Sequence, residues 1–241
     1  RALFGTFKVC EEDPNCNNQY PDLKNEFLNA MEKLEAEPYE FSYNGAPWVM
    51  NVQDFLLVLH QLLYRKETIG QIPSVITAIT TENEEVLRGA LGPTVAVANL
   101  INIAMYLSVN AYDELPFNDE DSLMTDLEAN PEIPEVPAFF GSDPKLLQEW
   151  HPYRAEAYEN ARVVSSIPTL IFNGSLDPIT PPVNAEKAAS GLSNSYYMLF
   201  KNEGHSFFSP CFFEISKAFL DQPEQRPDSD CLSSLPQIPW N

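Results

Sequence analysis

Apolar residues recur at helical spacing through roughly the first 160 residues of the chain. A helix predicted over residues 21–37 carries on one face Leu23, Phe27, Met31 and Leu34. Asn51 is a typical N-cap residue, and the helix predicted after it carries Val52, Phe55, Leu56, Leu59, Leu62 and Leu63. Further helices are predicted around residues 82–91 and 93–108. Because no clear series of strands interrupts these segments, residues 1–162 are predicted to be mostly helical.

The pattern changes after Arg162. A short apolar run, Thr169–Phe172, is typical of a buried parallel strand, and a turn follows it. A helix is predicted over residues 182–190, with Gly191 as its stop, then a strand over 196–200 and a helix over 210–220. This strand–helix–strand–helix order predicts that residues 163–241 are one piece of a parallel α/β sheet. Such a piece should expose the edge of its first strand.

Composition narrows the possible functions. The chain has 241 residues, 44% of them hydrophobic, which suffices for a sizeable core. Its 14 Lys+Arg and 35 Asp+Glu give a net charge of −21, which disfavours binding to nucleic acid or anionic lipid. The longest uncharged stretch, Gly89–Tyr112, contains proline, serine and asparagine residues, so a buried core helix is expected there rather than a membrane span. No leader is visible after Arg1, so we expect a mature, processed or truncated chain.

Four cysteines form two local pairs, Cys10 with Cys16 and Cys211 with Cys231. Neither pair has the spacing of a metal site. The even count in an acidic chain favours two disulfides and an oxidising compartment, secreted or periplasmic. The alternative is four buried thiols in a cytosolic protein.

Two residues at strand ends suggest acid–base chemistry. Asp177 follows the first predicted strand and His205 follows the second, and functional groups of α/β sheets gather at the carboxyl ends of strands. A histidine base needs a carboxylate that fixes its tautomer and stabilises the imidazolium. The alternative is a turn aspartate before a proline and a surface histidine.

These residues also carry a resemblance. The segment Ile167–Pro182 (IPTLIFNGSLDPITPP) resembles the acid-bearing strand and loop of α/β-hydrolases, and more narrowly the C-terminal region of tripeptidyl-aminopeptidase-like and prolyl-aminopeptidase-like serine exopeptidases. Asn202–Ser206 (NEGHS) resembles the histidine loop of that family, and Cys211 and Cys231 match its C-terminal cysteines. Near the start, CEEDPNC followed by YPDL resembles the entry to its helical cap. The resemblance implies the C-terminal portion of an α/β-hydrolase fold with a large, mostly helical cap, with Asp177 as triad acid and His205 as base.

The nucleophile of such a triad is missing from the sequence. A nucleophile elbow reads G-x-S-x-G, and no two of the nine glycines are four positions apart. Ser142 and Ser175 follow glycines, but neither lies on a strand-to-helix elbow before the acid. We therefore expect a C-terminal half that is inactive alone and needs the N-terminal half of the same hydrolase, which would hold the serine and the oxyanion donors.

One further segment suggests substrate binding. Val109–Phe117 resembles a family segment in which an acidic residue follows a cysteine by two positions, and Ala111 stands here in the place of that cysteine. Asp113 or Glu114 would then bind the α-ammonium group of a peptide with a free N-terminus. The alternative is a solvated acidic loop.

The sequence implies no cofactor, because it has neither a phosphate-binding glycine loop nor a metal motif. His60 and His151 have no matching ligand spacing and are predicted to be packing or surface residues. The function predicted is therefore an exopeptidase that releases residues or tripeptides from peptide N-termini. Two alternatives stay open: a non-catalytic binding module derived from a hydrolase, and an esterase-type acyl hydrolase.

Overall fold

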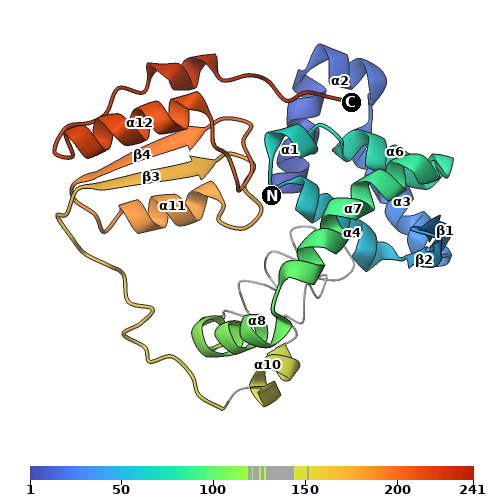
Figure 1. Cartoon of the computed structure of the whole chain (residues 1–241), viewed down its shortest axis with the longest axis horizontal. Helices are drawn as coiled ribbons and strands as arrows, with labels where there is room; N and C mark the ends of the chain where they lie inside the picture. The colour runs from blue at the N-terminus through green and yellow to red at the C-terminus, as the bar shows by residue number, and fades with distance from the viewer. Residues whose placement is uncertain (119–120, 122–124, 126–127, 129–143, 151) are drawn as a thin grey trace.

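The computed structural model describes residues 1–118, 121, 125, 128, 144–150 and 152–241. It is a mixed α/β structure, mostly helical, with two small sheets; we call residues 1–118 the helical region and residues 169–241 the sheet region (Figure 1). Among the described residues, the helices before the sheet region are α1 (Ala2–Glu12), α2 (Pro14–Gln19), α3 (Leu23–Ala36), α4 (Val52–Leu62), α5 (Lys66–Ile69), α6 (Ile72–Thr81), α7 (Glu84–Leu100), α8 (Ile103–Val109) and α10 (Pro144–Trp150). Short helical turns, Asn110–Glu114 and Leu115–Phe117, continue α8.

The two strongest helix predictions are confirmed. The apolar stripe of α3 is buried, and α3 packs mainly on α6. Asn51 caps α4 through a capping box: its side chain accepts a hydrogen bond from the Asp54 amide, and the Asp54 carboxylate accepts one from the Asn51 amide. This reciprocal pair satisfies two backbone donors that the first turn of a helix leaves free.

The helical region contains a β-hairpin, contrary to the prediction that no strand series lies there. Strand β1 (Tyr39–Tyr43) pairs antiparallel with β2 (Ala46–Met50), with Tyr39 opposite Met50 and Tyr43 opposite Ala46. Asn44 and Gly45 between the strands both have positive φ angles, 51° and 78°. An Asn-Gly pair adopts this backbone at low cost, which makes it a strong hairpin signal. The hairpin signal, Asn44-Gly45, is therefore present in the sequence, but helical periodicity does not reveal it.

The uncharged stretch also differs from its prediction. Pro93 lies inside α7 rather than at the start of a second helix, and the break comes after Ile101, where the Asn102 side chain caps α8. The buried residues of α7 end at Thr94 and Leu100 is 85% exposed, so the expectation of a buried core helix in this stretch holds only for its first part. No single helix among the described residues is long and apolar enough to cross a membrane; α7 and the segment 103–117 meet that requirement only as a pair bent by 75°.

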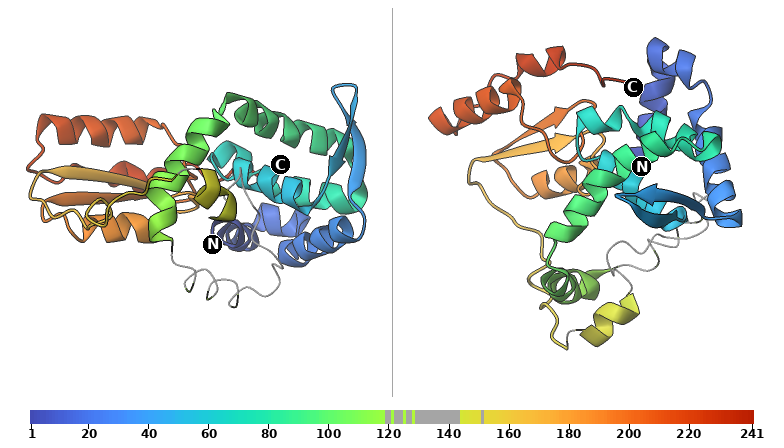
Figure 2. Two further views of the ribbon diagram at one scale, coloured as in Figure 1. Left: turned by 90° about the horizontal axis from the view of Figure 1, so that it is seen from below. Right: turned by 45° about the vertical axis from the view of Figure 1, so that its right-hand side comes forward.

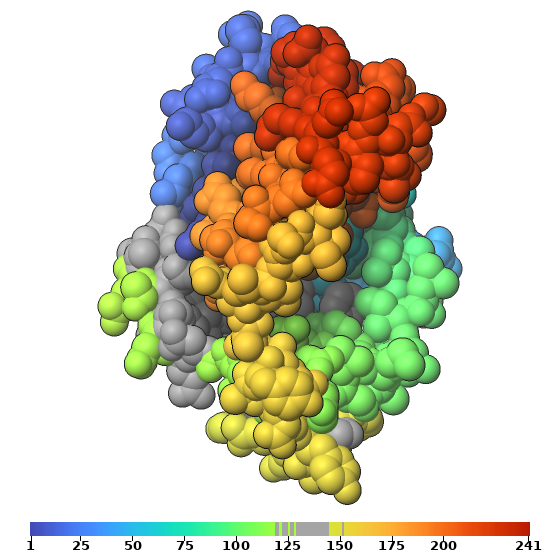
Figure 3. Space-filling model, turned by 90° about the vertical axis from the view of Figure 1, so that its left-hand side faces the viewer, coloured from blue at the N-terminus to red at the C-terminus, as the bar shows by residue number. Residues whose placement is uncertain are grey.

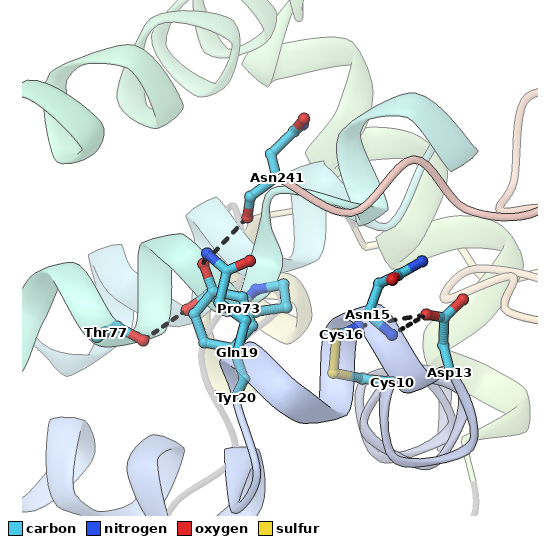
Figure 4. Close-up of a disulfide and its surroundings, with 9 residues drawn as sticks. All are labelled: Cys10, Asp13, Asn15, Cys16, Gln19, Tyr20, Pro73, Thr77 and Asn241. Atoms are coloured by element: carbon cyan, nitrogen blue, oxygen red, sulfur yellow. Dashed lines mark hydrogen bonds between the residues drawn. A yellow bond between two sulfur atoms is a disulfide. The ribbon is translucent and has the colours of Figure 1, made fainter.

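One continuous core fills the helical region and takes in the end of the chain. Phe4, Phe7, Phe27 and Phe55 form a chain of ring contacts inside it. Ile238 is buried in the same core, and a side chain at Gly70 would collide with the Pro239 carbonyl, so the C-terminal tail lies tightly on this region. Figure 4 shows the tail meeting α2, where the Tyr20 hydroxyl donates to the Asn241 carbonyl over 3.0 Å.

Both predicted disulfides are present. Cys10–Cys16 joins α1 to α2, and both cysteines are fully buried (Figure 4). Cys211–Cys231 joins α12 (Pro210–Asp221) to a short helical turn, Asp230–Ser234. Disulfides of this kind are typical of oxidising compartments, which weakly favours a setting outside the cytoplasm.

The sheet region has the predicted order of elements. Strand β3 (Thr169–Gly174) pairs in parallel with β4 (Ser195–Phe200), with Thr169 opposite Ser195 and Gly174 opposite Phe200. Helix α11 (Pro182–Ala189) links the strands and covers one face of the sheet, and α12 covers the other (Figure 2). Within the described residues β3 pairs with β4 alone, so its other edge has no strand beside it, as the pattern predicted.

Candidate active site

Asp177 and His205 lie in contact at the carboxyl ends of the two parallel strands. Nδ1 of His205 is 3.0 Å from Oδ2 and 3.1 Å from Oδ1 of Asp177. An ionised carboxylate can only accept a hydrogen bond, so Nδ1 carries the proton in this contact. Nε2 is then the ring nitrogen left for chemistry, and the His205 side chain is 34% exposed.

The carboxylate of Asp177 is 4% exposed and is held by its own loop. Oδ1 accepts hydrogen bonds from the amides of Ile179 (2.7 Å) and Thr180 (2.8 Å), and Oδ2 accepts one from the Thr180 hydroxyl (2.8 Å). Several donors to one buried carboxylate fix its orientation. Asp177 is therefore a buried, oriented carboxylate rather than a solvated turn residue.

Two residues that sequence reasoning did not single out support this loop. Asn173, at the end of β3, donates to the Thr180 carbonyl over 2.7 Å. Its own amide oxygen accepts a hydrogen bond from the hydroxyl of Tyr197 on β4, at 3.2 Å. Asn173 and Tyr197 occupy neighbouring strands and have no sequence motif in common, so the strand pairing was needed to bring them together.

An aromatic row from the helical region lies against the histidine. The Tyr64 ring contacts the His205 ring edge-on at 5.4 Å between centroids, and the His60 ring contacts Tyr64 at 5.5 Å. Burial raises the pKa of Tyr64, and the charge of Asp177 and then Tyr106 raise it further. Burial lowers the pKa of His60, and His205 adds to that effect. His60 is a packing residue, as predicted; His151 lies outside the described residues.

Residues 141–231 match the family model described as TAP-like protein. This segment is a TAP-like domain of the α/β-hydrolase type. It includes Asp177, His205 and the Cys211–Cys231 disulfide. No curated protein and no solved structure matches the chain.

One hollow lies at Asp177 and His205, and a second lies beside the loop that carries His205. A hollow of about 250 Å³ is lined by Asp177 and His205 together with the aromatic side chains Phe172, Phe207, Phe208 and Phe212. A larger one of about 880 Å³ lies between residues 65–67, the start of α12 and the C-terminal tail. The smaller hollow therefore gives an apolar approach to the two polar side chains, an arrangement typical of enzyme pockets.

Asp113 and Glu114, the predicted ammonium ligands, lie outside the TAP-like domain on the helical turn after α8. Both are exposed, and neither lines the two hollows described above. The link between this segment and the site is electrostatic: Tyr106 of α8 contributes to the raised pKa of Tyr64 in the aromatic row. Figure 3 shows a recess between the sheet region and the surface of α7 and α8. The described residues contain no group of three or more side chains that could hold a metal ion.

Proposed function

We propose that Asp177 and His205 are the acid and base of a Ser-His-Asp triad in a serine hydrolase, and that the serine and the oxyanion donors lie in a segment outside these 241 residues. The observation that carries the proposal is the hydrogen bond from His205 Nδ1 to the buried, oriented carboxylate of Asp177. In such a triad the histidine takes the serine proton through Nε2 and then gives it to the leaving amine, while the carboxylate stabilises the imidazolium. Water then attacks the acyl-enzyme in the same way.

The proposed substrates are short peptides with a free N-terminus, from which the enzyme releases residues or tripeptides. Two observations support this class. The stretch from Gly89 to Pro144 contains ten acidic residues and no Lys or Arg, so a cationic terminus is attracted there. Asp113 and Glu114 belong to that stretch and follow α8, which is linked electrostatically to the aromatic row beside His205. We propose that one of them binds the ammonium group.

The partner proposed for this chain is the N-terminal half of the same hydrolase. The free edge of β3 would pair with a strand of that half. Large apolar side chains before β3 and before or on α12 are exposed: Val163, Val164, Ile167, Phe208, Phe213 and Leu220. A secreted or periplasmic location agrees with the two disulfides and with the net charge of −21.

One observation favours a second function. The 241 residues contain no G-x-S-x-G, so a non-catalytic binding module that keeps the hydrolase fold is the alternative. The two proposals differ in what the reading frame upstream of Arg1 encodes. If the protein is an enzyme, we expect a G-x-S-x-G motif about 60 to 100 residues before Arg1, as in the usual hydrolase layout.

The test is complementation. Residues 1–241 are co-expressed with the region encoded upstream, and hydrolysis of aminoacyl and tripeptidyl p-nitroanilides is measured with free and with acetylated N-termini. We expect the free-amine substrates to be cleaved, and Asp177→Asn to lower kcat about 10⁴-fold because the histidine loses its orienting anion. The matched control is Asp22→Asn, which alters an exposed carboxylate on the helical region and should leave kcat unchanged.

Other outcomes separate the alternatives. Preference for a p-nitrophenyl ester over every peptide substrate would support the esterase. An unchanged KM for free-amine peptides in both Asp113→Asn and Glu114→Gln would contradict the ammonium site. Association of the two halves without hydrolysis of any substrate would favour the binding module.

A further inference from the structure

The loop that carries His205 is enclosed by a turn of the helical region. The turn lies between α4 and α5, and its Tyr64 carbonyl accepts a hydrogen bond from the Ser206 amide over 2.7 Å. A side chain at Gly204 would lie 2.0 Å from the Leu63 carbonyl oxygen, so only glycine fits this close approach. The backbone on each side of His205 is thus fastened to the same turn.

A buried ion pair also joins the helical region to the loop that carries His205. The Lys66 ammonium donates to the Glu203 carboxylate, and the two side chains are 8% and 5% exposed. The backbone of Glu203 also reaches the acid loop, because its carbonyl accepts a hydrogen bond from the Leu176 amide over 2.9 Å. Glu203 is therefore tied to the helical region by its side chain and to the residue before Asp177 by its main chain.

Breaking one partner of a buried ion pair leaves an uncompensated charge, so such a pair resists displacement. Glu203 stands two residues before His205, and the His205–Asp177 contact of 3.0 Å leaves little tolerance for movement of the loop. The Tyr64 ring, which contacts the imidazole edge-on, limits rotation of His205 in addition.

We propose that Lys66 and Glu203 are positioning residues: their ion pair fixes the histidine loop so that His205 Nδ1 stays bonded to Asp177. The helical region thereby sets the geometry of the base as well as covering the sheet region. An effect of this ion pair on catalysis rests on the function proposed above. Its effect on the position of the His205 side chain does not.

The geometric consequence is tested by NMR on residues 1–241, with neither nucleophile nor substrate. The His205 Nδ1–H proton, bonded to a carboxylate, should give a separate downfield resonance. We expect Glu203→Gln and Lys66→Met to raise its exchange rate with solvent at least about tenfold, the change that 1.4 kcal/mol produces. Leu87→Ala is the matched control, because it removes a fully buried side chain from the helical core and lowers stability without touching the turn.

A variant that leaves one buried charge unpaired can fail to fold, so the double variant Lys66→Met/Glu203→Gln is measured as well. It leaves no charge behind and should fold. We expect it too to show the faster exchange. A resonance that exchanges as slowly in the folded variants as in the unsubstituted chain overturns the proposal, as does equal acceleration in Leu87→Ala.

Measurements of hydrolysis separate the positioning role of Lys66 and Glu203 from the proposed hydrolase function. In the complemented enzyme, Glu203→Gln should lower kcat and leave KM unchanged, since it affects the base rather than substrate binding. If the Nδ1–H proton exchanges faster in Glu203→Gln but no form of the protein hydrolyses a substrate, the positioning role is supported and the triad is contradicted. Hydrolysis that Glu203→Gln leaves unchanged, with unchanged exchange, contradicts the positioning role alone. Absence of the resonance from the unsubstituted chain overturns both.

Discussion

The helical region and the sheet region of this chain bury their apolar residues very differently. Within the described residues the core of the helical region takes in parts of α1 to α7 and the hairpin, and it includes Leu176 and Ile238 from the C-terminal part. The core of the sheet region has only four buried members, Met198, Phe200, Cys211 and Ile215. The sheet region thus holds Asp177 and His205 but has little internal packing to keep them in place.

The difference shows where the rigidity of the site originates. Leu176 directly precedes Asp177 and is buried in the core of the helical region, beside α1. Glu203 precedes His205 by two residues and is paired with Lys66 of α5. Asp177 and His205 are therefore each anchored in the better-packed helical region, through a residue one or two positions before them. A small sheet can carry catalytic residues when a neighbouring core supplies the constraint.

The largest expected effect tests this contrast directly, with the same substitution in each region. Phe27→Ala removes a fully buried ring from the helical core and should lower the free energy of unfolding by about 3–5 kcal/mol. Phe213→Ala removes a ring of α12 that is 58% exposed, and should change it by no more than about 0.5 kcal/mol. Urea denaturation followed by circular dichroism measures both values. Equal losses would mean that α12 is as well packed as α3.

Sequence reasoning predicted that Asp177 and His205 lie together, because each residue follows a strand and the carboxyl ends of parallel strands share one edge; the contact between them is confirmed. It also predicted α3 and α4, whose apolar residues recur at helical spacing, and the order of the elements in the sheet region. It missed the hairpin, whose Asn44-Gly45 signal is two residues long, and it divided the continuous helix α7 between residues 91 and 93. Lys66 and Glu203 were beyond its reach, because 137 residues separate them and only packing brings them together. Long-range contacts of this kind leave no local pattern.

The second prediction compares the two disulfides, one in each region. In the chain-entropy description a cross-link stabilises in proportion to the logarithm of the loop that it closes. The separations are 6 residues for Cys10–Cys16 and 20 for Cys211–Cys231. We expect Cys211→Ala/Cys231→Ala to cost about 3 kcal/mol and Cys10→Ala/Cys16→Ala about 2 kcal/mol. Thermal denaturation of each double variant checks the order. The reverse order would mean that native packing around the fully buried Cys10–Cys16 outweighs loop entropy.

The smallest predicted effect concerns His60, which joins the helical core to the aromatic row beside His205. Burial, and secondarily the proximity of His205, lower its pKa below the ordinary value of 6.5. As the pH falls below that value, the unfolded chain binds a proton that the folded chain does not, so the free energy of unfolding decreases. The effect is absent above about pH 7.5 and is complete once the pH is below the lowered pKa of the folded state. One proton limits the slope to about 1.4 kcal/mol per pH unit.

His60→Gln should remove this component, so its melting temperature should fall less than that of the unsubstituted chain between pH 7.5 and pH 5. The carboxylates titrate in both proteins, and subtracting the two profiles isolates His60. His205→Gln sharpens the test: because burial is the larger cause of the lowered pKa, this variant should keep most of the pH dependence. Parallel profiles for His60→Gln and the unsubstituted chain would mean that His60 is solvated, and that the aromatic row is not a continuation of the helical core.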